Sequence, residues 1–136
     1  MITEAHGIPL AVSLTGGQRN DVTQLMPLLA AIPPVRGRRG RPRRRPDAAY
    51  ADRGYDHDKY RRLVRARGIV HQIARRGAEH GSGLGRHRWV VERTISHLHN
   101  KRRLLVCTDR TKATHDALLS LAVCLLCYSR YRQSLC

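Results

Sequence analysis

Residues 48–55 read Ala-Ala-Tyr-Ala-Asp-Arg-Gly-Tyr, a short apolar run that ends in an acid and a glycine turn. This run predicts a strand that stops at Asp52. A helical pattern follows over 58–67 and is closed by Gly68, and the apolar segment 69–74 predicts a second strand. Strand, helix and strand at this spacing predict a parallel pair joined by a right-handed crossover, and therefore an α/β fold.

Asp52 would lie at the carboxyl end of a parallel strand in this arrangement. Ligand sites in open α/β sheets gather at that edge, so Asp52 is a candidate functional carboxylate. The structural alternative is a turn or helix-cap role. Asp56 and Asp58 are better candidates for that role, because they immediately precede or begin the helix.

The segment before this unit predicts a strand and a helix. Apolar residues alternate over 8–14, as in a half-buried strand that a pair of glycines ends. Asn20 or Asp21 can cap a helix whose apolar residues continue to Ile32. Pro27 falls inside this helix and should kink it or weaken its first turns.

A run of arginine, glycine and proline separates that helix from the strand at 48. The run has no apolar period and cannot bury itself, so a mobile loop is predicted at about residues 33–47. Its dense positive charge beside the strand that ends at Asp52 favours contact with phosphate over a solvated linker without a ligand. The arginines expected to bind DNA in this loop are Arg36, Arg38, Arg39, Arg41, Arg43, Arg44 and Arg45.

The whole chain is basic: its 136 residues carry 26 Lys and Arg against 10 Asp and Glu, a formal net charge of +16. The length indicates one domain with a real core. The charge points to nucleic acid first and to an anionic membrane surface second, with an arginine-biased genome as the purely compositional alternative. The sequence shows no signal peptide and no apolar run long enough for a membrane span. We therefore expect a cytoplasmic protein, associated with the nucleoid.

A long helix is predicted over 87–104. Its buried stripe consists of Val91, Ile95 and Leu98. An adjacent polar face, at about 100° per residue, carries Arg88, Glu92, Ser96, His99 and Arg103. Glu92 would therefore lie at the edge of the core, either as a functional carboxylate or as half of a surface ion pair with Arg88.

A last helix, at about 114–132, is apolar nearly all round, so it is expected to be buried or to contact a partner. Cys124 and Cys127 lie in it. Core packing is a better interpretation of this pair than metal or redox chemistry, because no second cysteine pair lies beside it.

Asp52 and Glu92 are the two candidates that stand out, because acids are scarce in this chain. Two carboxylates on apolar elements of a basic protein fit one chemistry well. They can hold divalent metal ions against a nucleic-acid phosphate while the basic surface holds the polymer.

Three motifs resemble the carboxyl half of a bacterial insertion-sequence transposase of the DDE type: Ala51-Asp52-Arg53-Gly54-Tyr55-Asp56, Arg88-Trp89-Val90-Val91-Glu92-Arg93 and Lys101-Arg102-Arg103-Leu104. The segments Gly7 to Leu10 and Thr15 to Asp21 and the Arg/Pro-rich loop resemble this group as well. The resemblance thus covers nearly the whole chain, and the motifs together are specific.

This resemblance implies a partial RNase H-like fold, with a mixed sheet flanked by helices and N-terminal strands missing. It also implies a triad of two aspartates and one glutamate that binds Mg²⁺ or Mn²⁺. Asp52 matches the second aspartate and Glu92 the glutamate. Arg88 matches the arginine of the family's glutamate-helix signature, Gly85 stands where that signature has a tyrosine, and His99 or Lys101 stands near its lysine. The DNA-binding residues expected on this part of the chain are Arg88, His99, Lys101 and Arg103.

The chain departs from the family at the first aspartate. Glu4 is the only acid before Asp21, and its context does not fit. Residues 1–136 are therefore expected to form a single, truncated catalytic domain that is inactive alone. It would be the downstream frame of a two-frame element, joined to its upstream part by frameshifting, or a decayed copy.

Two functions follow from these expectations. The first is DNA binding with two-metal cleavage and strand transfer in DNA transposition. The second is a catalytically dead, basic nucleic-acid-binding remnant of a transposase. The expected partners are DNA at transposon ends and target, an upstream transposase segment and a second copy of the chain, with no membrane.

Overall fold

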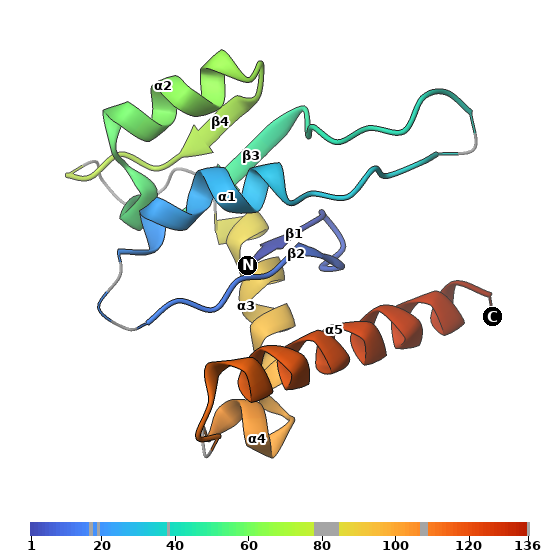
Figure 1. Cartoon of the computed structure of the whole chain (residues 1–136). Helices are drawn as coiled ribbons and strands as arrows, with labels where there is room; N and C mark the ends of the chain where they lie inside the picture. The colour runs from blue at the N-terminus through green and yellow to red at the C-terminus, as the bar shows by residue number, and fades with distance from the viewer. Residues whose placement is uncertain (17, 19, 38, 78–84, 107–108, 136) are drawn as a thin grey trace.

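The computed structural model describes residues 1–16, 18, 20–37, 39–77, 85–106 and 109–135 (Figure 1). Its elements in chain order are β1 (Ile2–Thr3), β2 (Pro9–Ala11), the 3₁₀ turn η1 (Asp21–Gln24), α1 (Leu25–Ala30), β3 (Ala48–Ala51), the 3₁₀ turn η2 (Arg53–Tyr55), α2 (Asp58–Ala66), β4 (Val70–Ile73), α3 (Gly85–His99), α4 (Arg102–Leu105) and α5 (Lys112–Leu135).

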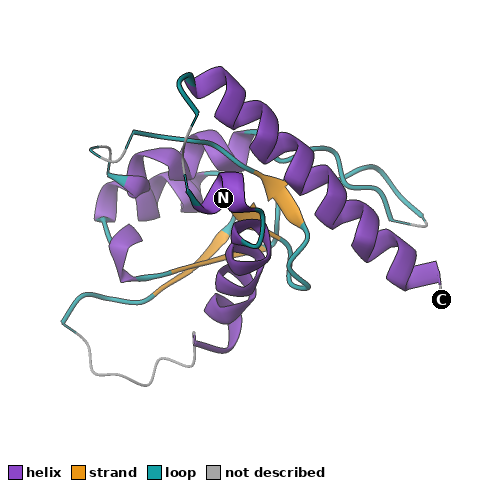
Figure 2. Ribbon diagram, turned by 90° about the horizontal axis from the view of Figure 1, so that it is seen from below, coloured by secondary structure: helices purple, strands orange, loops and turns teal. Residues whose placement is uncertain are grey.

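The described strands form two small sheets with helices around them (Figure 2). β1 and β2 pair antiparallel. β3 and β4 pair parallel, with Ala48 opposite Val70 and Ala51 opposite Ile73. The α/β class and the parallel pair are therefore confirmed. The one mixed sheet that was expected is instead two separate two-stranded sheets in the described part of the chain.

The β3–α2–β4 unit follows the sequence pattern closely. Gly68 ends the helical segment with φ +68°, a conformation that favours glycine. The predicted caps are wrong, however. His57 is the N-cap residue of α2 and makes no side-chain cap, and Asp58 already lies in the first turn. Asp56 does not cap α2, because its carboxylate binds two arginines instead.

The first strand is shorter than predicted. Alternation over 8–14 indicated one long strand, whereas β2 covers Pro9–Ala11 alone and pairs with β1, which the sequence analysis did not predict. Gly7 turns the chain between the two strands with φ +90°. A strand as short as β1 carries too little periodicity to be recognised without its partner.

The helical segment after β2 begins where it was predicted. The side chain of Asn20 accepts a hydrogen bond from the Val22 N–H at 3.3 Å and caps η1. Pro27 lies in the first turn of α1, where the lack of an N–H breaks no helical hydrogen bond. The helix therefore starts as a 3₁₀ turn and continues through the proline.

The main core lies between α1 and α2 and over the start of β4. Its buried residues are Leu25, Leu29, Ile32, Val64 and Ile69. Partly buried side chains from both sheets pack against this cluster, namely Ile2, Leu10 and Ala49. The two sheets thus share one core although their strands do not pair.

The buried face of α3 differs from the prediction. Val90, Thr94 and Leu98 are buried, whereas Ile95 is 37% exposed. The face is rotated because Thr94 donates a hydrogen bond to the Gly7 carbonyl at 2.9 Å, which lets a polar residue occupy the core. The predicted helix also breaks: α3 ends at His99, and α4 starts separately at Arg102.

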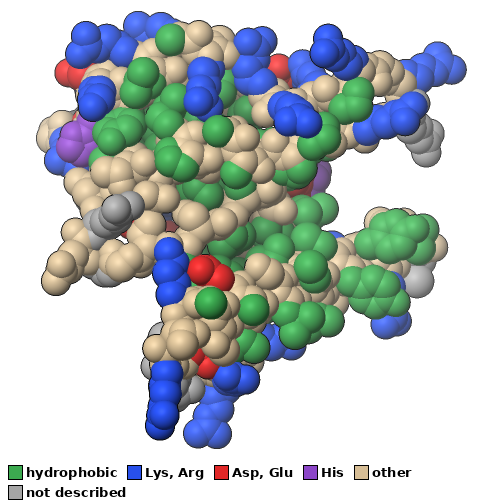
Figure 3. Space-filling view, viewed as in Figure 1, with side chains coloured by type: hydrophobic (Ala, Val, Ile, Leu, Met, Phe, Trp, Pro, Cys, Tyr) green, Lys and Arg blue, Asp and Glu red, His purple; other side chains and the backbone are tan. Residues whose placement is uncertain are grey.

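The last helix, α5, is far more exposed than its composition suggested. Ala122 is its one buried residue in the described range. Large apolar side chains face solvent along it, as Figure 3 shows toward the C-terminal end: Leu121, Leu125, Tyr128, Tyr131 and Leu135. Cys124 is exposed and Cys127 half-buried, so core packing was the wrong interpretation for Cys124. None of the described helices is long and apolar enough to cross a membrane.

Replacing Leu29 with alanine should cost about 2–5 kcal/mol of unfolding free energy, because the change opens a cavity in the shared core. The matched control is Leu121→Ala, at a position that is 58% exposed. This change should shift stability by no more than about 0.5 kcal/mol. Urea unfolding followed by circular dichroism measures both. Equal losses in the two variants would contradict the assigned core.

Candidate functional site

Asp52 lies where predicted, directly after the last residue of β3. It is the N-cap residue of η2, and its Oδ1 accepts a hydrogen bond from the Gly54 N–H at 2.9 Å. This contact is the cap role that the sequence offered as the alternative for Asp52. No other polar contact reaches the Asp52 side chain within the described residues. The second carboxylate oxygen therefore remains available to a ligand.

A hollow of about 510 Å³ opens beside Asp52. It is lined by residues that follow β2 and by the η1 and η2 segments with their N-cap residues: Thr15, Gly16, Asn20, Asp21, Asp52, Gly54 and Tyr55. Burial raises the pKa of the Tyr55 hydroxyl, and the nearby negative charges of Asp21 and Asp52 raise it further. Asp21 and Asp52 thus line the same hollow. From the sequence, Asp21 was predicted only as a possible helix cap.

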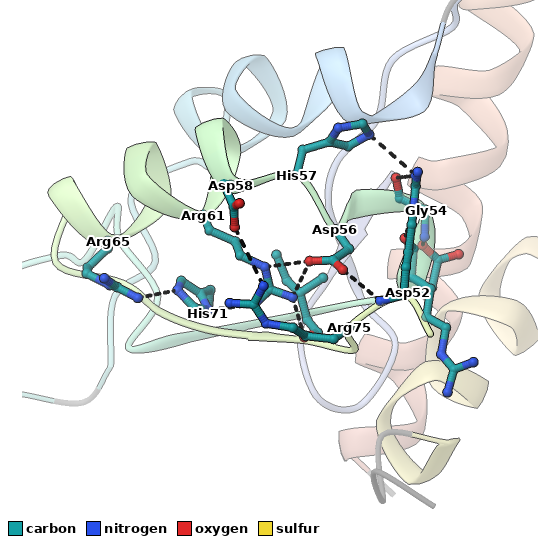
Figure 4. Close-up of polar contacts among 12 residues, drawn as sticks. Asp52, Gly54, Asp56, His57, Asp58, Arg61, Arg65, His71 and Arg75 are labelled. Atoms are coloured by element: carbon teal, nitrogen blue, oxygen red, sulfur yellow. Dashed lines mark hydrogen bonds and ion pairs between the residues drawn. The ribbon is translucent and has the colours of Figure 1, made fainter. Parts of the chain in front are cut away.

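A buried ion pair fixes the loop that carries Asp52. Arg61 on α2 is 7% exposed, and its Nε donates to Asp56 Oδ1 at 2.7 Å (Figure 4). The same guanidinium donates from Nη2 to the Ile73 carbonyl of β4 at 2.8 Å. Asp56, Arg61 and Ile73 therefore join the end of η2, the helix α2 and the strand β4.

Arg76 makes a second set of hydrogen bonds to the same loop. Its backbone N–H donates to Asp56 Oδ2 at 2.7 Å, and its side chain donates to the carbonyls of Arg53 and Gly54. Both oxygens of Asp56 are therefore occupied. Local sequence patterns do not predict this arrangement, because the contacts link residues 20 to 23 positions apart.

Glu92 occupies a different environment. It lies on α3, with 60% of its side chain exposed, and its Oε1 pairs with Arg88 Nε at 3.0 Å. This is the surface ion pair that the sequence left as an alternative. Glu92 also lines a second hollow, of about 420 Å³, with Ile95, Ser96, His99, Asn100 and Leu105. Stacking of Tyr50 on His87, with ring centroids 4.2 Å apart, connects α3 to β3.

The described residues do not by themselves fit a divalent metal ion. Asp52 and Glu92 line different hollows. No group of three or more His, Cys, Asp or Glu side chains lies together within the described ranges. Mg²⁺ prefers several oxygen ligands in near-octahedral geometry, and the two aspartates of the Asp52 hollow, Asp21 and Asp52, supply only part of such a set.

The basic residues divide into those with protein partners and those without. Arg43 pairs with Asp47 at 2.9 Å, Arg45 donates to the Arg67 carbonyl at 2.9 Å, and Arg103 pairs with Asp109 at 2.6 Å. Arg38 lies outside the described residues. Side chains that are exposed and make no polar contact in the described part of the chain are Arg36, Arg39, Arg41, Arg44 and Lys101. Figure 3 shows Lys and Arg side chains over the loop between α1 and β3.

The stability of the fold should fall in acid through Asp56. The backbone N–H of Arg76, followed by the Arg61 side chain, lowers the pKa of Asp56 below its ordinary value of 3.8. A carboxylate with a lowered folded-state pKa contributes stability above the unfolded pKa and loses it as the pH falls through the folded pKa. Asp56→Asn should therefore lower Tm at pH 7 and reduce the dependence of Tm on pH below about 4.

Thermal unfolding between about pH 2.5 and pH 7 measures this effect. The control is Asp58→Asn, which removes an exposed acid whose contact with Arg75 spans 3.8 Å. In Asp58→Asn, the fall of Tm at low pH should be close to that of the parent protein. Arg103 lowers the pKa of Asp109 in the same direction, so part of the slope should persist in Asp56→Asn. If Asp56→Asn left the fall of Tm at low pH unchanged, Asp56 would not be the group responsible for the loss of stability in acid.

Comparison with known proteins identifies the family. The sequence model of the family described as "Transposase DDE domain" matches residues 1–128. A protein of Burkholderia cepacia, named as an inferred transposase for insertion sequence element IS402, is 54% identical over 134 residues. That match covers 98% of this chain and 64% of the length of the relative. No solved structure matches the chain. The resemblance seen in the motifs is thereby confirmed, and the chain belongs to the family of insertion-sequence DDE transposases.

Proposed function

We propose that this chain works in DNA transposition as part of a DDE transposase. Its basic surface binds DNA, and Asp52 and Glu92 belong to the catalytic carboxylates. The observation that carries the proposal is the placement of Asp52. It lies at the carboxyl end of a parallel strand, and Arg61 and Arg76 hold its loop through Asp56. One oxygen of the Asp52 carboxylate has no partner among the described residues. Ligand sites of α/β sheets gather at this edge.

The fold proposed for the complete catalytic unit is RNase H-like. The parallel β3–β4 pair with its helical crossover, and α3 stacked against β3 through His87, are the parts of this chain that support it. The β1 and β2 strands pair antiparallel and pack on the same core, so the chain contains both parallel and antiparallel strand pairs. Family membership supports the assignment independently.

A divalent ion such as Mg²⁺ or Mn²⁺ would supply Lewis-acid activation of the scissile phosphate and of the attacking oxygen. The described residues alone do not complete a site for it, since Asp52 and Glu92 line separate hollows. We therefore propose that further oxygen ligands come from another transposase segment or from a rearrangement on DNA. The proposed task of this chain is to hold Asp52 rigidly and to bind the phosphate backbone.

A catalytically dead, DNA-binding remnant is the second candidate. The observation that favours it is the ion pair of Glu92 with Arg88 at 3.0 Å, which occupies the second carboxylate. An exposed pair of this kind is weak, so DNA or metal could displace Arg88 in an active enzyme. Activity of the longer protein separates the two candidates.

The first prediction for function concerns cleavage. The 136-residue chain alone should not nick plasmid DNA in Mg²⁺, because its described carboxylates do not converge. Addition of an upstream transposase segment should produce Mg²⁺-dependent nicking. Asp52→Asn and Glu92→Gln should each reduce that nicking by at least about a hundredfold, since electrostatic stabilisation of phosphoryl transfer would be lost.

The control for this experiment is Asp58→Asn, which removes an exposed acid with the same change of charge. It should leave nicking close to the parent level. Bound but uncut DNA with the longer protein would support the dead remnant. Strong nicking by the short chain alone, abolished by Glu92→Gln, would falsify the incomplete-site argument.

The second prediction concerns DNA affinity and salt. Each phosphate contact adds about 0.9 to the slope of log K against log salt. Replacing Arg36, Arg39, Arg41 and Arg44 with serine should therefore reduce the slope by up to about 3–4. The measurement is fluorescence anisotropy on a mixed-sequence duplex at several salt concentrations.

A charge-matched control removes four arginines from other elements: Arg62, Arg110, Arg130 and Arg132. The slope should change much less in this variant, because those side chains lie on α2 and in or next to α5. Equal changes in the two variants would show that net charge alone sets affinity and that the loop makes no special contact.

A further inference from the structure

The loop between α1 and β3 is fastened at its base. Val35 and Arg43 form an antiparallel bridge with two backbone hydrogen bonds of 2.8 Å each. The Arg43 side chain makes a two-pronged pair with Asp47, and Arg45 donates to the Arg67 carbonyl of the α2–β4 turn. We call residues 35–45 the basic arm. Figure 1 shows it extending from the body of the protein beyond α1 and β3.

The tip of the basic arm has an unusual composition. Residues 36–42 contain only arginine, glycine and proline. Pro42 is their only apolar residue, and they include no large aliphatic or aromatic side chain that could anchor in a membrane. The sequence carries no acid between Asp21 and Asp47, so no nearby carboxylate along the chain neutralises the tip. A strongly anionic partner therefore fits the tip better than an apolar one.

Gly40 lies between the bridged residues Val35 and Arg43 and has φ +98°. A Cβ built at Gly40 would meet no atom within 4 Å, so packing does not require the glycine. Its backbone conformation does, since residues with a side chain rarely adopt it. Without a side chain between Arg39 and Arg41, the backbone can also approach a surface closely while both guanidiniums reach along it.

Two grooves of duplex DNA could receive this tip. The major groove is about 12 Å wide and suits an α-helix or a two-stranded ribbon. The arm has a single bridge at its base, and its described tip residues form neither. The minor groove is about 6 Å wide and offers adenine N3 and thymine O2 as acceptors. A·T-rich tracts narrow it further and strengthen its negative potential, which attracts inserted arginine.

We propose that the Arg39-Gly40-Arg41 tip of the basic arm inserts into the minor groove of A·T-rich duplex DNA. The proposal rests on the DNA-binding function proposed above and adds the groove and the base composition that the arm prefers. The fastened base holds the tip outward, and Pro42 stiffens the chain beside it. The other exposed arginines of the arm contact the flanking phosphates.

The test uses the whole 136-residue chain and three duplexes of equal length, with an A·T core, a G·C core and an inosine·C core. Inosine lacks the guanine N2 amino group, so the inosine·C core resembles A·T in the minor groove and G·C in the major groove. Anisotropy titrations should give affinities for the A·T and inosine·C duplexes on the order of tenfold above the G·C duplex.

Two glycine variants test the role of the tip. Gly40→Val should remove most of the base preference, because the added side chain strains the positive φ and blocks close approach. It should keep the salt slope, since no charge is lost. Gly37→Val is the control in the same arm, at a position without positive φ. It should retain the preference.

Four results would overturn the proposal. Equal affinity for all three duplexes would exclude base preference while leaving the DNA-binding function intact. An inosine·C duplex that binds like G·C would assign the contact to the major groove. Loss of the preference in Gly37→Val but not in Gly40→Val would exclude the tip. Binding to none of the duplexes would contradict the proposed DNA-binding function as well.

Discussion

The buried pair of Asp56 and Arg61 is the contact on which the candidate site depends. One guanidinium binds the carboxylate that ends η2 and the Ile73 carbonyl that ends β4. A charged group that is only 7% exposed is costly to leave unpaired, so these elements cannot separate without a large loss of free energy. Asp52 lies at the other end of the same short turn. The position of Asp52 is thus set by an ion pair in which it takes no part.

The β3–α2–β4 unit could be predicted from sequence because its signals are local. An apolar run, a helical period, Gly68 and a second apolar run follow one another within 27 residues, at 48 to 74. The role of Asp56 could not be predicted in the same way. An acid just before a helix suggests a cap, and Arg61 in a basic helix suggests solvent exposure. Only the fold brings Ile73 and Arg76 to them, and these contacts outweigh the cap.

The helix α3 shows a second limit of sequence patterns. Counting apolar residues selected Val91, Ile95 and Leu98, whereas Val90, Thr94 and Leu98 are buried. Thr94 is tolerated in the core because its hydroxyl donates to the Gly7 carbonyl, 87 positions away in sequence. Because threonine is partly polar, the apolar period placed the buried face about one residue away from its observed position. The observed orientation of α3 matters for the site, because Glu92 is 60% exposed in it and pairs with Arg88 of the same helix.

The distribution of acids explains why Asp52 remains the strongest candidate. Most described carboxylates are already neutralised by this basic chain: Asp47, Asp56, Asp58, Glu92 and Asp109 all lie in ion pairs. Asp21 and Asp52 line one hollow, and neither forms an ion pair within the described residues. Both carboxylates are therefore left to a hollow that no described arginine side chain lines. The fold therefore pairs most of its described acids with arginine, but it leaves Asp21 and Asp52 beside the fixed η2 turn, and the exposed arginines at the tip of the basic arm, without such partners among the described residues.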